Sequence, residues 1–149
     1  MPDANSGAQF QLRGIELHEL FIAKPAPGTD PPAQFNFDLT IESNVDAPQK
    51  IVINSVRVGI KGESSDQPLG SLTCTCIFSV ANFDEVVTMK SEIEAEIGDS
   101  FSETLNSITI STARGMMASE LKGTYLHFAI LPIIDIKNLK KNMPQALAG

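Results

Sequence analysis

Four segments in the first part of the chain alternate apolar and polar residues with a period of two. This is the period of a β-strand, whose successive side chains point to opposite faces of a sheet. In the second segment, Phe35, Phe37 and Leu39 would share one face, and the polar residues between them would face water. Such half-buried strands are typical of antiparallel sheets. We expect the strands at residues 10–23, 35–43, 50–62 and 71–83.

The first of these segments changes phase at Gly14. Before it, Phe10 and Leu12 share one face, and after it Leu17 and Phe21 fall on the other. Glycine inside a strand often marks a bulge, where one extra residue shifts the alternation. We therefore expect a bulge or bend at Gly14. The loop that follows, residues 24–34, contains four prolines and should have no regular structure.

The period changes after the fourth strand. Val86, Met89, Ile93 and Ile97 recur at spacings of three and four, which predicts an amphipathic helix over 84–99. A second apolar stripe predicts the main helix over 100–123, followed by an extended stretch, 124–132. A short last helix at 136–142 would be capped by Asp135. The fold class is therefore α+β: a four-stranded antiparallel sheet with helices packed on one face, in sequential strand order if the connections are short.

The chain of 149 residues suits a single domain, residues 1–149, with flexible ends at 1–8 and 143–149. Its net charge of −7 argues against nucleic acid as a partner, because phosphate binding needs a basic patch. The N-terminus lacks the basic start and apolar middle of a signal peptide, and no apolar run is long enough to span a membrane. We expect a cytoplasmic protein without membrane insertion.

Few side chains suggest chemistry. His18 and His127 stand alone, and no glycine-rich phosphate loop or nucleophile elbow is present. Cys74 and Cys76 would point the same way on a strand, about 6.5 Å apart, which is too far for a disulfide. Their spacing is also too short for a usual zinc site. The expectation is free thiols, no metal, no cofactor and no enzymatic activity.

The order of the segments resembles the bacterial protein-export chaperone SecB and its SecB-like relatives. "FQLRGIELHELFI" is similar to the opening strand of that family, and "IFSVANF" to a short motif at the end of its fourth strand. "TAR" followed by "MMASELKGTYLHFAILPIIDIKNL" is similar to its main helix, linker and last helix. The resemblance implies a homotetramer, built as a dimer of dimers, that holds unfolded preproteins for export without ATP.

The resemblance also implies sites. Glu19 matches one acidic position through which the export form docks the SecA motor. Fourth-strand positions would serve the oligomer interface: Leu72, Cys74 and Cys76. The client-binding groove would lie between the sheet edge, the linker and the helices, and would comprise Phe21, Phe78, Val80, Tyr125, Leu126, Phe128 and Leu131.

The sequence departs from the family at several of these positions. Ala23 and Ser71 stand where two other SecA-docking residues would be acidic, and Gly115 replaces the glutamate after the arginine of the main helix. These departures favour one alternative to an export chaperone, and the apolar stripe, if it forms a single pocket, favours another. One is a SecB-like chaperone of a toxin–antitoxin system, with an antitoxin as partner. The other is a binding module for a small apolar ligand or a single protein partner.

Overall fold

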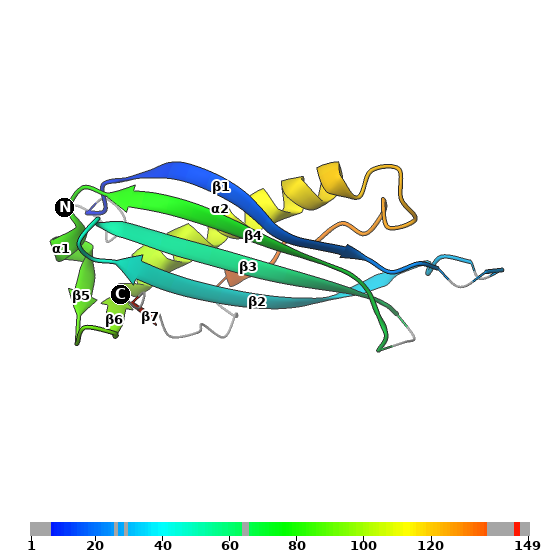
Figure 1. Ribbon diagram of the computed structural model, residues 1–149, viewed down its shortest axis with the longest axis horizontal. Helices are drawn as coiled ribbons and strands as arrows, with labels where there is room; N and C mark the ends of the chain where they lie inside the picture. The colour runs from blue at the N-terminus through cyan, green and yellow to red at the C-terminus, as the bar shows by residue number, and fades with distance from the viewer. Residues whose placement is uncertain (1–6, 26, 29, 64–65, 137–144, 147–149) are drawn as a thin grey trace.

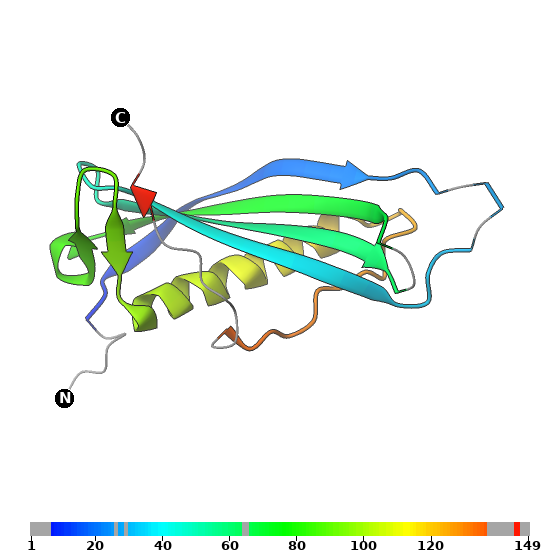
Figure 2. The same cartoon turned by 90° about the horizontal axis from the view of Figure 1, so that it is seen from below.

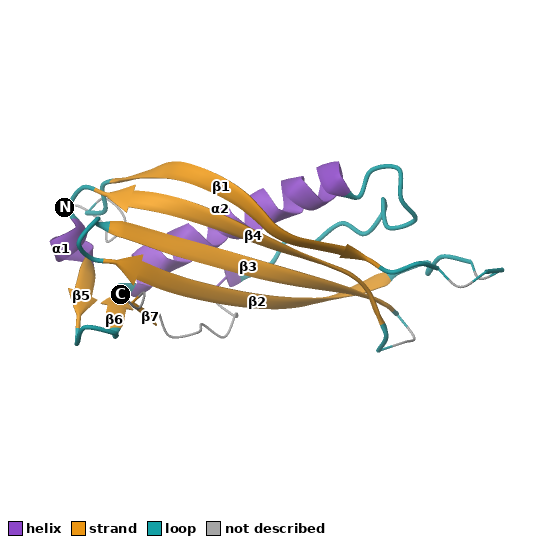
Figure 3. Ribbon diagram, in the orientation of Figure 1, coloured by secondary structure: helices purple, strands orange, loops and turns teal. Residues whose placement is uncertain are grey.

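The chain forms a long twisted sheet with one long helix behind it (Figure 1). The computed structural model describes residues 7–136, except 26, 29, 64 and 65, together with 145 and 146. The long strands and the main helix match the predicted segments to within three residues at most ends (Figure 3). The elements are β1 (Phe10–Ile22), β2 (Phe35–Asp46), β3 (Ile51–Gly62), β4 (Pro68–Val80), α1 (Phe83–Val86), β5 (Val87–Met89), β6 (Ala95–Ile97), α2 (Asp99–Glu120) and β7 (Gln145–Ala146).

The strand order is β1-β4-β3-β2-β7, so the expected sequential order is wrong at the first strand. The connections from β2 to β3 and from β3 to β4 are short, and these strands pair as antiparallel neighbours. The longer, proline-rich loop after β1 carries the chain past two strands, and β1 pairs with β4 instead. As a result, β1 is an edge strand.

The predicted helix over 84–99 is also wrong. Only α1 is helical there, and the rest forms the β5–β6 hairpin, closed by an ion pair of 2.7 Å between Lys90 and Glu96. The helical spacing was coincidental, because Met89 and Ile93 of the supposed apolar stripe are exposed. The buried side chains instead alternate along β6, from Ala95 to Ile97, with the period of a strand.

One face of the sheet is covered by α2, which packs on β3 and β4 (Figure 2). Between the two layers lie fully buried side chains such as Val56 and Phe78 from the sheet and Leu105 from the helix. This burial stabilises α2 although β-branched residues and Gly115 lower its helix propensity. The expected α+β fold, with a four-stranded antiparallel sheet and helical cover on one face, is confirmed.

A polar cluster lies inside this core. The amide nitrogen of Asn54 donates hydrogen bonds to Asn106 Oδ1 at 3.1 Å and Thr109 Oγ1 at 2.9 Å, both on α2. Ser43 on β2 donates to Asn54 Oδ1 at 2.5 Å. Because buried amides are costly without partners, this cluster fixes the register of α2 over the sheet.

Two bulges shape β1. The first falls between Leu12 and Gly14, as predicted, and the second between Leu17 and Glu19. Together they return the apolar residues to one face, because Leu12, Leu17 and Leu20 all pair with buried residues of β4. The second bulge, which the pattern did not reveal, turns Phe21 to the opposite face, where it pairs with Ser71.

The ends of the chain lie partly outside the described residues. The predicted helix at 136–142 falls almost wholly on residues that the structure does not describe. Of the C-terminal residues expected to be flexible, Gln145 and Ala146 form β7, which pairs in parallel with β2. No helix among the described residues is long and apolar enough to cross a membrane.

Candidate functional site

Residues 121–136, here called the linker, follow α2 and return along the sheet. They begin as consecutive turns, with Thr124 N–H bonded to Leu121 O at 3.1 Å and His127 N–H to Thr124 O at 3.1 Å. Gly123, at φ 84°, permits the reversal after the helix. The prediction of an extended stretch from 124 onward is therefore wrong for its first half, and the chain leaves these turns only near Ala129.

The start of the linker is fixed to the end of the sheet by Tyr125 and Leu126. The Tyr125 hydroxyl donates to Ala23 O at 2.7 Å, and burial raises the pKa of this phenol. Leu126 is fully buried and packs beside Gly70 of β4. A Cβ at Gly70 would lie 2.8 Å from Leu126 Cδ1 and 3.0 Å from Phe21 O, so this close approach requires glycine.

The second half of the linker is held by Arg114 of α2. Its Nε donates to Leu131 O at 2.8 Å, and one terminal nitrogen donates to Pro132 O at 2.9 Å. The rigid fork of the guanidinium suits two adjacent carbonyl groups. Arg114 therefore fixes the backbone of the linker against the helix.

Between these attachment points, the linker presents large apolar side chains to water. Phe128 is 80% exposed, Ile130 60% and Ile133 88%, whereas Ala129 and Leu131 between them are buried. The alternation follows from the extended backbone, which turns every second side chain toward the core. Single exposed apolar residues are ordinary, but three this exposed on one short segment make it the candidate interaction surface.

A cavity of about 400 Å³ opens beside the start of the linker. Tyr125 and Leu69 form part of its wall, and the proline-rich loop after β1 forms much of the rest. Sequence reasoning missed this cavity because it treated the prolines only as breakers of regular structure. The available signal was the group of prolines in that loop, three of which line the cavity together with Pro68. The prolines lining it are Pro25, Pro31, Pro32 and Pro68.

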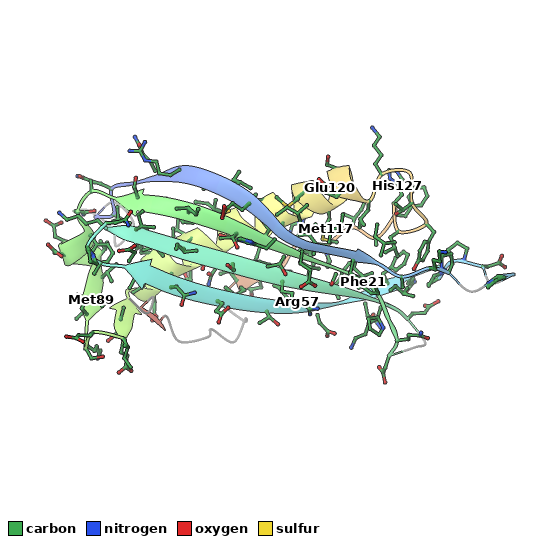
Figure 4. The ribbon with its side chains drawn as sticks, viewed as in Figure 1. Phe21, Arg57, Met89, Met117, Glu120 and His127 are labelled. Carbon is green, nitrogen blue, oxygen red and sulfur yellow. The ribbon has the colours of Figure 1, made fainter. Side chains whose placement is uncertain are left out.

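The structure separates the predicted groove residues. Phe128 is exposed and Tyr125 partly buried, and both lie on the linker. Phe21 is exposed, but it lies on the outer face of the sheet, in a depression of about 510 Å³. In Figure 4 it can be compared with His127, which lies in the linker turn beyond the end of α2. The remaining four are core residues, at most 2% exposed in this chain: Phe78, Val80, Leu126 and Leu131.

The predicted interface residues are also buried. Leu72, Cys74 and Cys76 lie on the face of β4 that α2 covers, at most 1% exposed. Both cysteines are free thiols. A hydrogen bond with Cys76 and burial together raise the pKa of the Cys74 thiol. In this chain, these side chains pack the core and offer no surface to a second copy.

The apolar side chains of β1 that lie next to these buried β4 residues are accessible to solvent. Because α2 packs mainly on β3 and β4, the inner face of the edge strand remains uncovered. Four apolar side chains there are between 38% and 50% exposed, and we call them the β1 row: Leu12, Ile15, Leu17 and Leu20.

Glu19 lies on the outer face of β1 and already has partners. Its carboxylate accepts a hydrogen bond from Ser71 Oγ at 2.9 Å and lies 3.5 Å from the guanidinium of Arg57. Both contacts use the same oxygen, Oε1, and the side chain remains 48% exposed. Among the described residues, no group of three or more His, Cys, Asp or Glu side chains could hold a metal ion.

No family model matches the sequence, and no curated protein does. Among solved structures, the chain is similar to the SecB-like chaperone of Mycobacterium tuberculosis in complex with a ChAD peptide from the HigA1 antitoxin. The match has a TM-score of 0.56 at 16% identity and covers 89% of this chain and 94% of that one. The chain has a SecB-like fold. A protein of unknown function from Streptococcus agalactiae is matched with a TM-score of 0.39 at 10% identity, over 77% of this chain and 89% of that one.

The SecB-like fold confirms the resemblance at the level of architecture. In this fold the linker follows α2, and the edge strand β1 lies next to β4, on which α2 packs. The accessible apolar surface of this fold therefore consists of three parts: the linker side chains, the proline-lined cavity and the β1 row.

Replacing Arg114 with methionine should release the linker from α2. The loss of two charge-assisted hydrogen bonds to backbone carbonyls is expected to cost about 2 kcal/mol of local stability. Hydrogen exchange should then be faster than in the wild type at Ala129, whose N–H bonds to Leu126 O at 2.9 Å. Lys122→Met, an exposed change at the helix end, is the control. Equal exchange in Arg114→Met and wild type would show that the side chains of the linker hold it without the arginine.

Proposed function

We propose that this protein is an ATP-independent molecular chaperone, a holdase that binds unfolded chains in the cytoplasm. The observation that carries the proposal is the group formed by Phe128, Ile130 and Ile133, which the linker holds outward on a SecB-like fold. Such a surface is costly to keep in water unless it has an apolar partner. The proline-lined cavity beside it offers a recess for one bulky apolar side chain of the client.

The physical basis of such binding needs no sequence code. Burying apolar client surface stabilises the complex by about 25 cal/mol for each Å². An extended client also has backbone groups that can pair with an open sheet edge. Because the holdase binds the unfolded state and not the folded one, it shifts the folding equilibrium by mass action, without a nucleotide.

Aggregation of a refolding client tests this proposal. Light scattering should fall when the protein is present at molar excess, and adding ATP should not change the result. Scattering that is unaffected at any excess would refute holdase activity. A bound small apolar molecule in the proline-lined cavity, without any effect on scattering, would favour the binding-module alternative.

We further propose that the active form is a homo-oligomer, a tetramer built as a dimer of dimers. The β1 row supports this, since β1 combines an unpaired strand edge with four half-exposed apolar side chains. Exposed edge strands of this length readily pair with another chain. Several client surfaces on one oligomer would raise the affinity for a long client through effective concentration.

Glutamate in place of Ile15 should disrupt this assembly. Ile15 is 50% exposed in the middle of the β1 row, so the free chain should tolerate the charge, but an apolar interface should not. Analytical ultracentrifugation should show a smaller species than the wild type. Thr40→Glu, an exposed change on β2, is the control. A wild type that is already monomeric at micromolar concentration would refute the oligomer.

A toxin–antitoxin role is the second candidate. It is favoured by one observation: the similar chaperone from Mycobacterium tuberculosis was solved with an antitoxin peptide. Support for delivery to SecA is weaker, because Ala23 and Ser71 stand where two further acidic docking residues would be expected beside Glu19. Pull-down of the intact protein from its native cells distinguishes the two, since an antitoxin and SecA differ in identity and size.

A further inference from the structure

A cavity of about 620 Å³ lies where the start of β1, the end of β4 and the turn between β2 and β3 meet. This is the end of the sheet opposite to the one where Tyr125 binds Ala23 (Figure 1). Six of its ten lining residues are polar. The polar residues that line it are Gln9, Gln11, Arg13, Gln49, Lys50 and Ser79.

The two cations of this cavity lack carboxylate partners. Neither Arg13 nor Lys50 forms an ion pair with any described residue, although the chain has 18 acidic and 11 basic residues. Three other basic side chains pair with a carboxylate, as Lys61 does with Asp38 at 2.7 Å, whereas Lys24 and Lys122 also have no such partner among the described residues. In a chain with so many carboxylates, two unpaired cations in one cavity are available to a ligand.

Arg13 is oriented for such a ligand. Its Nε donates to Ser79 Oγ on β4 at 2.9 Å, which fixes the plane of the guanidinium. The terminal nitrogens carry four further donors, and adjacent N–H groups of a guanidinium fit a carboxylate.

Lys50 adds an independent observation. It is the one non-glycine residue with a positive φ, 57°, in the part of the chain that the structure describes. Lysine pays a steric cost in this conformation that glycine would avoid. Strained positions of this kind occur where a side chain is needed, and here the side chain lines the cavity.

We propose that this cavity binds an acidic segment of a partner protein, one with at least two neighbouring Asp or Glu side chains. Arg13 and Lys50 would each meet one carboxylate. The amides of Gln9, Gln11 and Gln49 both donate and accept hydrogen bonds, which suits the peptide groups of such a segment better than a bare anion. The site is separate from the linker surface, so it does not depend on holdase activity.

The net charge of −7 affects how an acidic segment could bind to this chain. At long range the chain repels an acidic segment, so the attraction must come from the two local cations. Removing either cation should therefore weaken binding strongly, and added salt should do the same.

Fluorescence anisotropy with a labelled hexaglutamate peptide tests the site, using the intact protein at low ionic strength and hexaglutamine as the reference peptide. Arg13→Gln and Lys50→Gly should each weaken hexaglutamate binding about tenfold. Lys122→Gln, which makes the same change of charge outside the cavity, should bind like the wild type. The Tm of Lys50→Gly should equal or exceed that of the wild type, since glycine relieves the strained φ.

Three results would overturn the proposal. The first is unchanged affinity in both cavity variants, and the second is equal binding of the two peptides. The third is displacement of hexaglutamate by an equal concentration of inorganic phosphate, which would assign the cavity to small anions. Suppression of client aggregation should be the same in Lys50→Gly and wild type, so a failure here and a failure of the holdase proposal are distinguishable.

Discussion

Alanine in place of Phe78 is expected to lower the free energy of unfolding by about 3–5 kcal/mol. Phe78 is fully buried between the sheet and α2, and its ring packs edge-on against Phe10 with centroids 5.9 Å apart. The substitution removes the ring and leaves a cavity that a close-packed core fills only in part. Since domains are stable by about 5–15 kcal/mol, this single change removes a large share of the total. Urea denaturation followed by circular dichroism measures it.

Phe128 provides a matched control for this prediction. It is the same residue type, but it is 80% exposed, so Phe128→Ala should change the free energy of unfolding by less than about 0.5 kcal/mol. The resemblance to SecB assigned both residues to the client groove, and the two substitutions separate core from surface. If Phe78→Ala kept full stability and lost client binding, Phe78 would belong to the groove and not to the core.

The sequence predicted the sheet because each long strand alternates over many residues. A period of two sustained through β2, from Phe35 to Ile41, has no other ready interpretation. The 84–99 segment misled because it is short and sparsely apolar. Four apolar residues fit a helix by chance, whereas the observed hairpin is closed by backbone hydrogen bonds from Lys90 and Ser91 to Glu94 O and by the Lys90–Glu96 ion pair.

The site was predicted less well, for a physical reason. Local pattern identifies apolar side chains, but it does not tell which of them the tertiary structure covers. Leu131 and Ile133 are both aliphatic and two residues apart, yet one is 1% and the other 88% exposed. The difference depends on Arg114, 17 residues away from Leu131, which sets how the linker lies on the helix. The open edge of β1 likewise follows from the strand order, which the sequence did not reveal.

Serine in place of Phe128, Ile130 and Ile133 together should abolish client holding while leaving the fold intact. These side chains are 60–88% exposed, so replacing them should change the packing of the core and the stability of the fold little. Their loss deprives a client of the apolar area on the linker, and affinity should fall by at least about a hundredfold, since burying each such side chain contributes about 1.5–3 kcal/mol. Light scattering of a refolding client and the Tm of the free protein measure the two effects.

The matched control is Ile93→Ser. Ile93 is 70% exposed in the β5–β6 hairpin, which lies at the end of the sheet away from Tyr125 (Figure 1). It is as accessible as the linker residues, so a binding mode that used any exposed apolar side chain would respond to both changes. Loss of holding in the triple variant alone would place the client on the linker. Full holding by the triple variant would refute the linker as the client surface.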